Sequence, residues 1–180
     1  MMRLNRSGQR REVLVSTAAM LHHTTIGESG PVLVIVHGLF GSGRNWTSVA
    51  RKLSGVFQVV LPDLRNHGES FWSNAHDYPA MAQDLAELIE TLDAPVHLLG
   101  HSMGGKAAMV LALKRPDLVD RLIIADIAPV AYEHTQMPYL DAMRAVDLSR
   151  VARRSDAAAQ LADRGVSPAL QSFSTLLHPV

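Results

Sequence analysis

Short apolar runs alternate along this chain with longer segments whose apolar residues recur at helical spacing. Residues 32–36 form an unbroken apolar run rich in β-branched side chains, which predicts a central strand buried on both faces. Residues 79–92 begin with a proline and carry apolar side chains every three or four positions, which predicts an amphipathic helix. The same reasoning predicts further strands at 21–26, 57–61, 96–99 and 122–125, and further helices at 46–53 and 106–114.

The order of these elements predicts the fold class. Strands and helices that alternate, with continuously apolar strands, indicate an α/β domain in which helices flank a mostly parallel sheet. We expect this core to span residues 20–130. Residues 132–148 and 151–165 are compatible with helices but rich in Arg, Asp and Ala, which predicts a partial helical lid within residues 131–180. Ligands of such sheets bind beyond the carboxyl ends of the strands.

The composition narrows the classes of function. The formal net charge is zero, which gives no electrostatic reason to expect a nucleic-acid or anionic-membrane partner. No apolar run approaches the roughly 18 residues that span a bilayer. Cysteine is absent, so disulfides, thiol nucleophiles and thiolate metal sites are excluded. This composition is compatible with a reducing compartment, and we expect a cytoplasmic protein.

Residues 1–19 form a basic N-terminal extension, in which Glu12 is the single acid among several arginines. This composition resembles that of a transit peptide. We favour a disordered basic extension, or a start codon upstream of a true start at Met20, because chain termini are often disordered.

The pentapeptide Gly100-His101-Ser102-Met103-Gly104 carries the clearest chemical signal. It lies between a predicted strand and a predicted helix, the context in which a G-x-S-x-G motif forms a nucleophile elbow. The turn is so tight that only small residues fit two positions either side of the serine. It presents the hydroxyl at the carboxyl edge of the sheet and at the positive end of a helix. Ser102 is therefore the candidate nucleophile.

A glycine-rich loop, residues 37–43, directly follows the central strand. In a serine hydrolase such a loop supplies one backbone N–H for the oxyanion, and the residue after the nucleophile supplies the other. The candidate donors are Leu39 and Met103. A phosphate-binding loop for a dinucleotide, with Asp63 on the ribose, is the alternative hypothesis. Its spacing fails, because Trp46 stands where the third glycine or alanine belongs.

Two further polar segments follow predicted strands. Residues 63–70 combine Asp, Arg, His and a late Gly-x-Ser. This mixture predicts a hydrogen-bonded loop that braces the glycine-rich loop, rather than a catalytic role for Asp63 or His67. Asp126 ends the last predicted strand and is well placed to orient an imidazole, which fits the chain order of serine, acid and histidine. A helix cap or a solvated strand end is the alternative interpretation of Asp126.

The remaining candidates have weaker patterns. His22 and His23 point to opposite faces of a strand, and His97 and His101 have no third ligand nearby, so we predict no metal site. Lys106 lies four residues after the candidate nucleophile, and helix geometry points its side chain back toward the elbow. A Ser–Lys dyad and a bracing lysine are both open there, and we favour the brace.

Four motifs in a fixed order resemble the α/β-hydrolase superfamily, and within it small esterases of the YbfF type, over about residues 20–148. The motifs are His37-Gly38-Leu39-Phe40-Gly41-Ser42, Asp63-Leu64-Arg65-Asn66-His67-Gly68-Glu69-Ser70, Gly100-His101-Ser102-Met103-Gly104-Gly105-Lys106 and Asp126-Ile127-Ala128-Pro129. The resemblance implies a cofactor-free esterase or thioesterase that acts on small-molecule, short-acyl esters through an acyl-enzyme. It also implies that Ser102 is the nucleophile, Asp126 the acid, and Leu39 and Met103 the oxyanion donors.

The chain departs from this family at its C-terminal end. Members continue beyond the lid through further strand–helix units, and a loop there carries the histidine that deprotonates the serine. Here the downstream histidines are His134 and His178, and neither follows a predicted strand. The alternative hypothesis is a truncated, catalytically incompetent hydrolase-like fragment without the general base. We take an esterase as the ancestry and expect this 180-residue chain itself to have weak or no activity unless a partner supplies the imidazole. We also expect the missing strands to leave an exposed apolar sheet edge.

Overall fold

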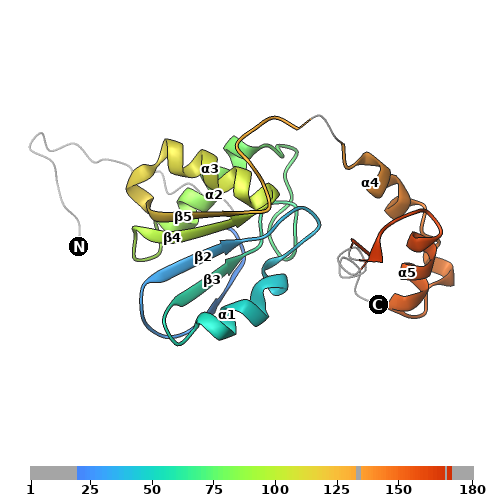
Figure 1. Cartoon of the computed structure of the whole chain (residues 1–180), viewed down its shortest axis with the longest axis horizontal. Coiled ribbons are helices and arrows are strands. Elements are labelled where there is room, and N and C mark those ends of the chain that lie inside the picture. Colours follow the sequence, from blue (N-terminus) through green and yellow to red (C-terminus); the bar gives the residue numbers. More distant parts are fainter. Residues whose placement is uncertain (1–19, 133–134, 169, 172–180) are drawn as a thin grey trace, which may run out of the picture.

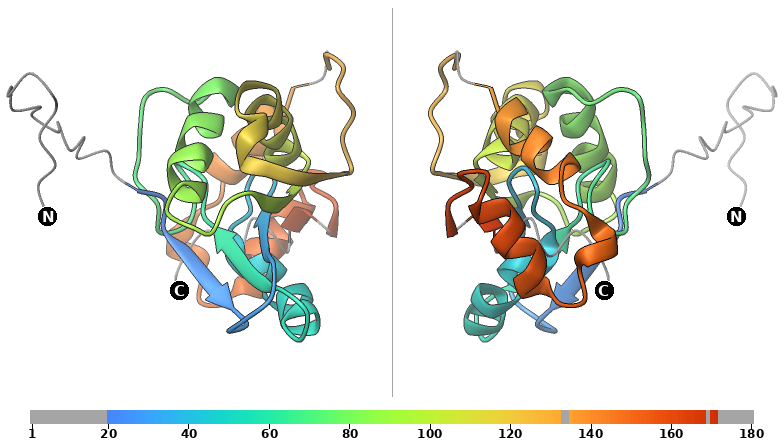
Figure 2. Two further views of the ribbon diagram at one scale, coloured as in Figure 1. Left: turned by 90° about the vertical axis from the view of Figure 1, so that its left-hand side faces the viewer. Right: turned by 90° about the vertical axis from the view of Figure 1, so that its right-hand side faces the viewer.

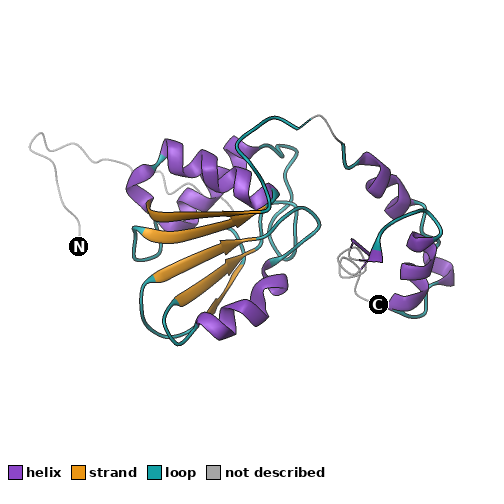
Figure 3. Cartoon of the chain, in the orientation of Figure 1, coloured by secondary structure: helices purple, strands orange, loops and turns teal. Residues whose placement is uncertain are grey.

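The computed structural model describes residues 20–132, 135–168 and 170–171. Its centre is a five-stranded sheet with the strand order β1-β3-β2-β4-β5 (Figures 1 and 3). β1 pairs antiparallel with β3, and the other neighbours are parallel, which confirms the predicted mostly parallel sheet. The strands are β1 (His23–Ile26), β2 (Val32–Val36), β3 (Gln58–Pro62), β4 (Val96–His101) and β5 (Val119–Ala125).

Helices cover both faces of this sheet. α1 (Thr47–Leu53) follows the short 3-10 turn Gly43–Trp46 on one face, whereas α2 (Tyr78–Ile89) and α3 (Met103–Lys114) lie together on the other (Figures 1 and 2). Asp77 caps α2, because its carboxylate accepts the N–H of Ala80 at 2.8 Å. The layers are therefore helix, sheet and helix.

The central strand explains why its sequence has no polar positions. Val32, Val34 and Val36 pack into the apolar cluster beneath α2 and α3. Leu33 and Ile35 point the other way and pack with Ala50 of α1. Side chains alternate across a strand, so a strand with helices on both faces must be apolar at every position. The prediction that residues 32–36 form a doubly buried strand is confirmed.

Strand register brings the polar strand ends together. Val36 pairs with Gly100, so the loop after β2 begins beside the end of β4. His101 pairs with Ala125, and the N–H of Ser102 donates to the Ala125 carbonyl at 3.0 Å. The loops after β2, β4 and β5 therefore meet at one edge of the sheet, as parallel strands require.

Several element ends differ from the predicted ones. α3 begins at Met103, three residues before the predicted start, because Gly104 and Gly105 are poor helix formers that packing places in a helix. β4 continues through His101, and β5 begins at Val119, ahead of the apolar residues on which its prediction rested. Gly100 and His101 at the end of β4, and Asp120 and Arg121 near the start of β5, lie outside the apolar runs, so a search for such runs misses these parts of the strands.

The C-terminal helices pack on one another. α4 (Met137–Arg144), the short 3-10 turn Leu148–Arg150 and α5 (Arg154–Ala162) are shorter than predicted. Ala142, Leu161 and Val166 form their own small apolar cluster. Figure 1 shows these helices beyond the edge at which the strands end. Their role as a lid stays a prediction, and the predicted extension 1–19 lies outside the described residues.

In the described part of the chain, every helix is too short or too polar to cross a bilayer.

We expect the substitution Leu98→Ala to lower the free energy of unfolding by about 2–5 kcal/mol, because it opens a cavity in the centre of the core. Leu98 is fully buried, whereas Leu113 is 84% exposed on α3. Leu113→Ala is the matched control and should change stability by less than about 0.5 kcal/mol. Urea unfolding measures both, and equal losses would contradict this core.

Candidate active site

Ser102 lies at the sharp turn between β4 and α3. Its backbone has φ 50° and ψ −117°, a strained conformation for a residue with a side chain. A Cβ atom on Gly100 would lie 2.6 Å from the carbonyl oxygen of Gly104, and a Cβ on Gly104 would collide with the carbonyl of His37. Strand and helix therefore approach as closely as a nucleophile elbow requires.

The loop after β2 lies directly against this elbow. A Cβ on Gly38 would lie 2.9 Å from Nδ1 of His101 and 3.2 Å from Cβ of Ser102. The N–H of Gly41 donates to the carbonyl of Gly38 at 3.0 Å and closes the loop into a turn. Among the described residues, the backbone N–H groups of Leu39 and Met103 have no acceptor. The structure brings the glycine-rich loop and the candidate nucleophile together.

His37 fixes this loop from inside the protein. Its Nδ1 lies 2.8 Å from the Gly38 carbonyl, and its Nε2 accepts the N–H of Leu64 at 3.0 Å. Nδ1 is therefore the protonated nitrogen of a neutral ring. Burial lowers the pKa of His37 from 6.5 to about 4, against the opposing effect of the Gly38 hydrogen bond. The ring of His67 lies 5.2 Å away, and burial lowers its pKa as well.

The carboxylate of Asp63 links the loops after β2 and β3. Oδ1 accepts the N–H of Gly43 at 2.7 Å, and Oδ2 accepts the N–H of Glu69 at 2.9 Å. The hydroxyl of Ser70 donates to the Asp63 carbonyl at 2.5 Å. This network confirms the predicted brace. It also engages the carboxylate that the dinucleotide hypothesis assigned to a ribose.

A buried ion pair that the sequence reasoning missed anchors the loop after β3 to α2. Arg65 makes two hydrogen bonds to the Asp84 carboxylate, each 2.6 Å long, and a third to the Ala75 carbonyl. The Asp84 hydrogen bond raises the pKa of Arg65. The available signal was the position of Asp84, which falls on the apolar face of α2 between Met81 and Leu85. A carboxylate at such a position needs a partner.

Asp126 follows β5 immediately beside the elbow. Its φ of 57° is unusual for a residue with a side chain, and its side chain is 83% exposed. Oδ2 of Asp126 lies 3.6 Å from Nε2 of His101. The ring of His101 in turn contacts the ring of Trp46, with centroids 5.9 Å apart. The acid candidate and the elbow are therefore neighbours.

Lys106 contacts the loop after β5, and the histidines considered as metal ligands contact other groups. The Lys106 ammonium donates to the carbonyl of Val130 and lies 5.0 Å from the ring centroid of Tyr132. Its contacts are thus with the loop after β5, as a bracing lysine requires. His22 lies 3.2 Å from the Asp63 carboxylate. Within the described residues, no three His, Asp or Glu side chains are grouped as metal ligands.

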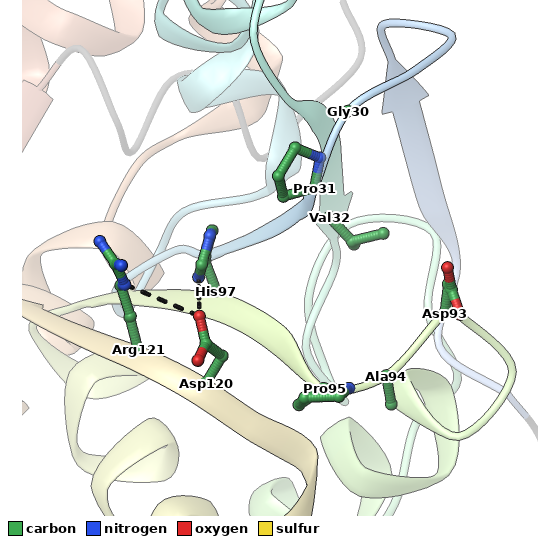
Figure 4. Close-up of a pocket in the computed structure, with 9 residues that line it drawn as sticks. All are labelled: Gly30, Pro31, Val32, Asp93, Ala94, Pro95, His97, Asp120 and Arg121. Carbon is green, nitrogen blue, oxygen red and sulfur yellow. Dashed lines mark ion pairs between the residues drawn. The ribbon is translucent and has the colours of Figure 1, made fainter.

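A hollow lies at the edge of the sheet opposite to the elbow, and Figure 4 shows the residues that line it. It has a volume of about 470 Å³, and its lining comes from the amino ends of the strands: Gly30, Pro31, Val32, Asp93, Ala94, Pro95, His97, Asp120 and Arg121. Asp120 lies between His97 and Arg121, with Oδ2 3.1 Å from Nδ1 of His97. That nitrogen is buried and makes no hydrogen bond in the described structure. This groove is remote from Ser102.

Residues 31–178 match the model of a family described by the alpha/beta hydrolase fold. The chain belongs to this family. It is 43% identical over 143 residues to the sn-1-specific diacylglycerol lipase ABHD11 of Mus musculus, covering 76% of this chain and 46% of the relative. It is also 43% identical over 134 residues to the Esterase YbfF of Escherichia coli (strain K12), covering 71% and 51%.

Among solved structures, this chain resembles a marine microorganism esterase with a TM-score of 0.81 and 40% identity, covering 87% of this chain and 63% of that one. A thioesterase domain from the curacin biosynthetic pathway is similar at a TM-score of 0.63 and 26% identity, with coverage of 88% and 64%. These similarities confirm the predicted fold class and the resemblance to small esterases. The chain spans about half the length of the curated relatives that it matches.

The buried, neutral His37 predicts a loss of stability in acid. A pKa that folding lowers from 6.5 to about 4 corresponds to about 3 kcal/mol. Between these two pH values the unfolded chain binds a proton that the folded chain does not, so the free energy of unfolding falls as the pH falls through this window. Urea unfolding at pH 7, 5.5 and 4 measures the decline.

His37→Gln should flatten this decline, although it lowers stability at pH 7. His23→Gln, which removes a partly exposed histidine instead, should keep the decline of the wild type. An equal pH dependence in the wild type and His37→Gln would contradict the assignment.

Proposed function

We propose that this chain is a serine hydrolase that cleaves small-molecule carboxylic esters or thioesters through an acyl-enzyme intermediate. The observation that carries the proposal is the strained backbone of Ser102, with φ 50°, between a buried strand and the N-terminus of α3. Such strain persists only where the surrounding packing enforces it, and it is typical of functional sites. The names esterase and lipase among the relatives support the same chemistry.

The reaction has two steps. Ser102 Oγ attacks the acyl carbonyl carbon while its proton passes to a general base. The C–O or C–S bond then breaks, and the alcohol or thiol leaves with that proton. Water next attacks the acyl-enzyme, gives up a proton by the same route, and releases the carboxylic acid as the Ser102 hydroxyl is restored.

Leu39 and Met103 are the proposed oxyanion donors. Each has a backbone N–H without an acceptor among the described residues, and each lies next to a residue at the elbow contact, Gly38 and Ser102. The N-terminal end of α3 adds positive potential at the same place. Donors fixed before the reaction stabilise the charge that develops on the carbonyl oxygen without reorganisation.

Asp126 is the proposed acid, which would hold an imidazole in the orientation that accepts the serine proton. Its place after β5 and its distance of 3.6 Å from His101 Nε2 support a position beside the elbow. His134 and His178 lie outside the described residues, and neither is assigned as the base. A cytoplasmic location and the absence of a nucleic-acid partner stay predictions.

A hydrolase-like domain without turnover is the second candidate. Among the described residues, the histidines with lowered pKa values, His37 and His67, hold backbone carbonyls with Nδ1. Such a domain would keep the elbow and both donors but lack the base. Loss of the base from a triad lowers turnover by about 10⁶-fold.

Turnover and covalent labelling distinguish the two candidates. The first candidate predicts that the chain hydrolyses short-acyl p-nitrophenyl esters and reacts with a fluorophosphonate, and that Ser102→Ala abolishes both. Ser155→Ala, at an exposed serine of α5, is the matched control and should retain both. Labelling at Ser102 without turnover would favour the inactive domain. Wild-type turnover in Ser102→Ala would end the proposal.

The position of the oxyanion loop is tested by one added methyl group. Gly38→Ala places a Cβ at 2.9 Å from His101 Nδ1 and 3.2 Å from Ser102 Cβ, so the loop must move. We expect kcat/KM for an ester to fall by about 10²-fold or more, the cost of misplacing one oxyanion donor. Gly55→Ala, where an added Cβ meets nothing within 4 Å, should leave kcat/KM unchanged. Equal activity of both variants would contradict the assignment of the donors.

A further inference from the structure

A lysine of α3 holds the loop that follows β5, residues 126–132. The Lys106 ammonium donates to the carbonyl of Val130 and lies 5.0 Å from the ring centroid of Tyr132. The Tyr132 hydroxyl accepts the N–H of Ala128 at 3.0 Å. The Lys106 side chain therefore contacts the loop at Val130 and Tyr132, and Tyr132 in turn holds Ala128. We call these four residues the lysine clamp.

The residue before Lys106 gives the same loop a second attachment. A Cβ on Gly105 would lie 2.6 Å from Cγ2 of Ile127, so the missing side chain lets Ile127 pack directly against α3. The adjacent residues Gly105 and Lys106 thus hold the loop on either side of Ala128. Most of the loop is otherwise exposed: Val130 is 54% exposed and Tyr132 45%. Its course depends on these contacts.

The position of Asp126 depends on the backbone of the loop more than on the contacts of its own side chain. The carboxylate is 83% exposed, and Oδ2 lies 3.6 Å from Nε2 of His101, which is long for a hydrogen bond. Its backbone has a positive φ of 57°, a conformation that the neighbouring chain must maintain. The direction of the carboxylate is therefore set by the backbone that the clamp holds.

We propose that Lys106 is a positioning residue for the hydrolase reaction, and that through the lysine clamp it holds Asp126 beside the elbow. The inference rests on the proposed function of Ser102 and Asp126. Lys106 acts through other residues, because its ammonium contacts the loop after β5. A positive charge is needed on this side chain, since both the carbonyl of Val130 and the ring of Tyr132 attract a cation.

Three variants separate the parts of the clamp. Lys106→Met keeps the aliphatic length and removes the cation, so it loses both contacts. Lys106→Arg keeps a cation and its donors, and it should restore much of what Met loses. Tyr132→Phe keeps the ring and removes the oxygen that accepts the Ala128 N–H. Lys114→Met, at the exposed end of α3, is the matched control.

Amide hydrogen exchange tests the clamp without any need for activity. In the full chain, we expect Lys106→Met to speed exchange across residues 126–132 by at least about tenfold, while urea unfolding shows that global stability is kept. Tyr132→Phe should speed exchange at Ala128, which keeps the test open if Lys106→Met does not fold. Lys106→Arg and Lys114→Met should exchange within about threefold of the wild type.

Steady-state ester hydrolysis tests the positioning role. We expect Lys106→Met to lower kcat by about tenfold with KM within about twofold, because Asp126 acts in the transition state rather than in substrate binding. Lys106→Arg should recover kcat to within about threefold of the wild type. A lysine with a purely structural role would change stability without lowering kcat at constant KM, and Lys106→Arg would not recover kcat.

Each outcome of these two experiments either supports or overturns the positioning role of Lys106. Faster exchange together with lower kcat supports the inference. Unchanged exchange in Lys106→Met, or faster exchange with unchanged kcat, overturns it. A wild-type chain without turnover refutes the proposed function separately. In that case unchanged exchange in Lys106→Met refutes the clamp as well. Faster exchange would still support Lys106 as the residue that holds the loop.

Discussion

The N-terminus of α3 lies so close to β2 and β4 that no side chain fits between them, and the geometry of the site depends on this contact. Gly100 and Gly104 are the residues at which the backbones meet. Behind them, Ala107, Ala108 and Leu111 of α3 are buried in the main core. Burial of this apolar face holds the helix in place, and the strained turn at Ser102 is the local consequence. The packing that forms the fold therefore also fixes the backbone conformation of the candidate nucleophile.

The proposed oxyanion loop, residues 37–43, depends on a second constraint, which is that the buried His37 ring is neutral. In the neutral ring one nitrogen donates to Gly38 and the other accepts from Leu64, so a single side chain joins the loops after β2 and β3. A protonated ring would present an N–H to the N–H of Leu64 and lose that bond. Burial therefore disfavours the one protonation state that would release the loop. The Asp63 carboxylate ties the same region to the 3-10 turn Gly43–Trp46, and the Arg65–Asp84 pair ties it to α2.

Much of this arrangement follows from local sequence, and the rest follows from contacts that sequence patterns do not contain. The apolar run 32–36 predicts its strand because burial on both faces leaves no polar position. The motif around Ser102 and the polar loop from Asp63 also lie where the sequence places them. The partner of Asp84 is 19 residues away in the chain, and helical spacing shows that a partner is needed without naming it. The early start of α3 is missed because packing outweighs the low helix propensity of glycine.

The two halves of the candidate site are held by different forces. Met103 and His37 are buried and Ser102 between its neighbours is half-buried, so packing keeps this part of the site in position. Asp126 lies on an exposed loop that a few polar and cation–ring contacts hold against α3. Contacts of that kind are individually weak and are opened by local fluctuations more readily than a packed core. The part of the site proposed to stabilise the oxyanion is therefore built into the fold, whereas the position of Asp126, the proposed acid, is set by the path of the chain after β5.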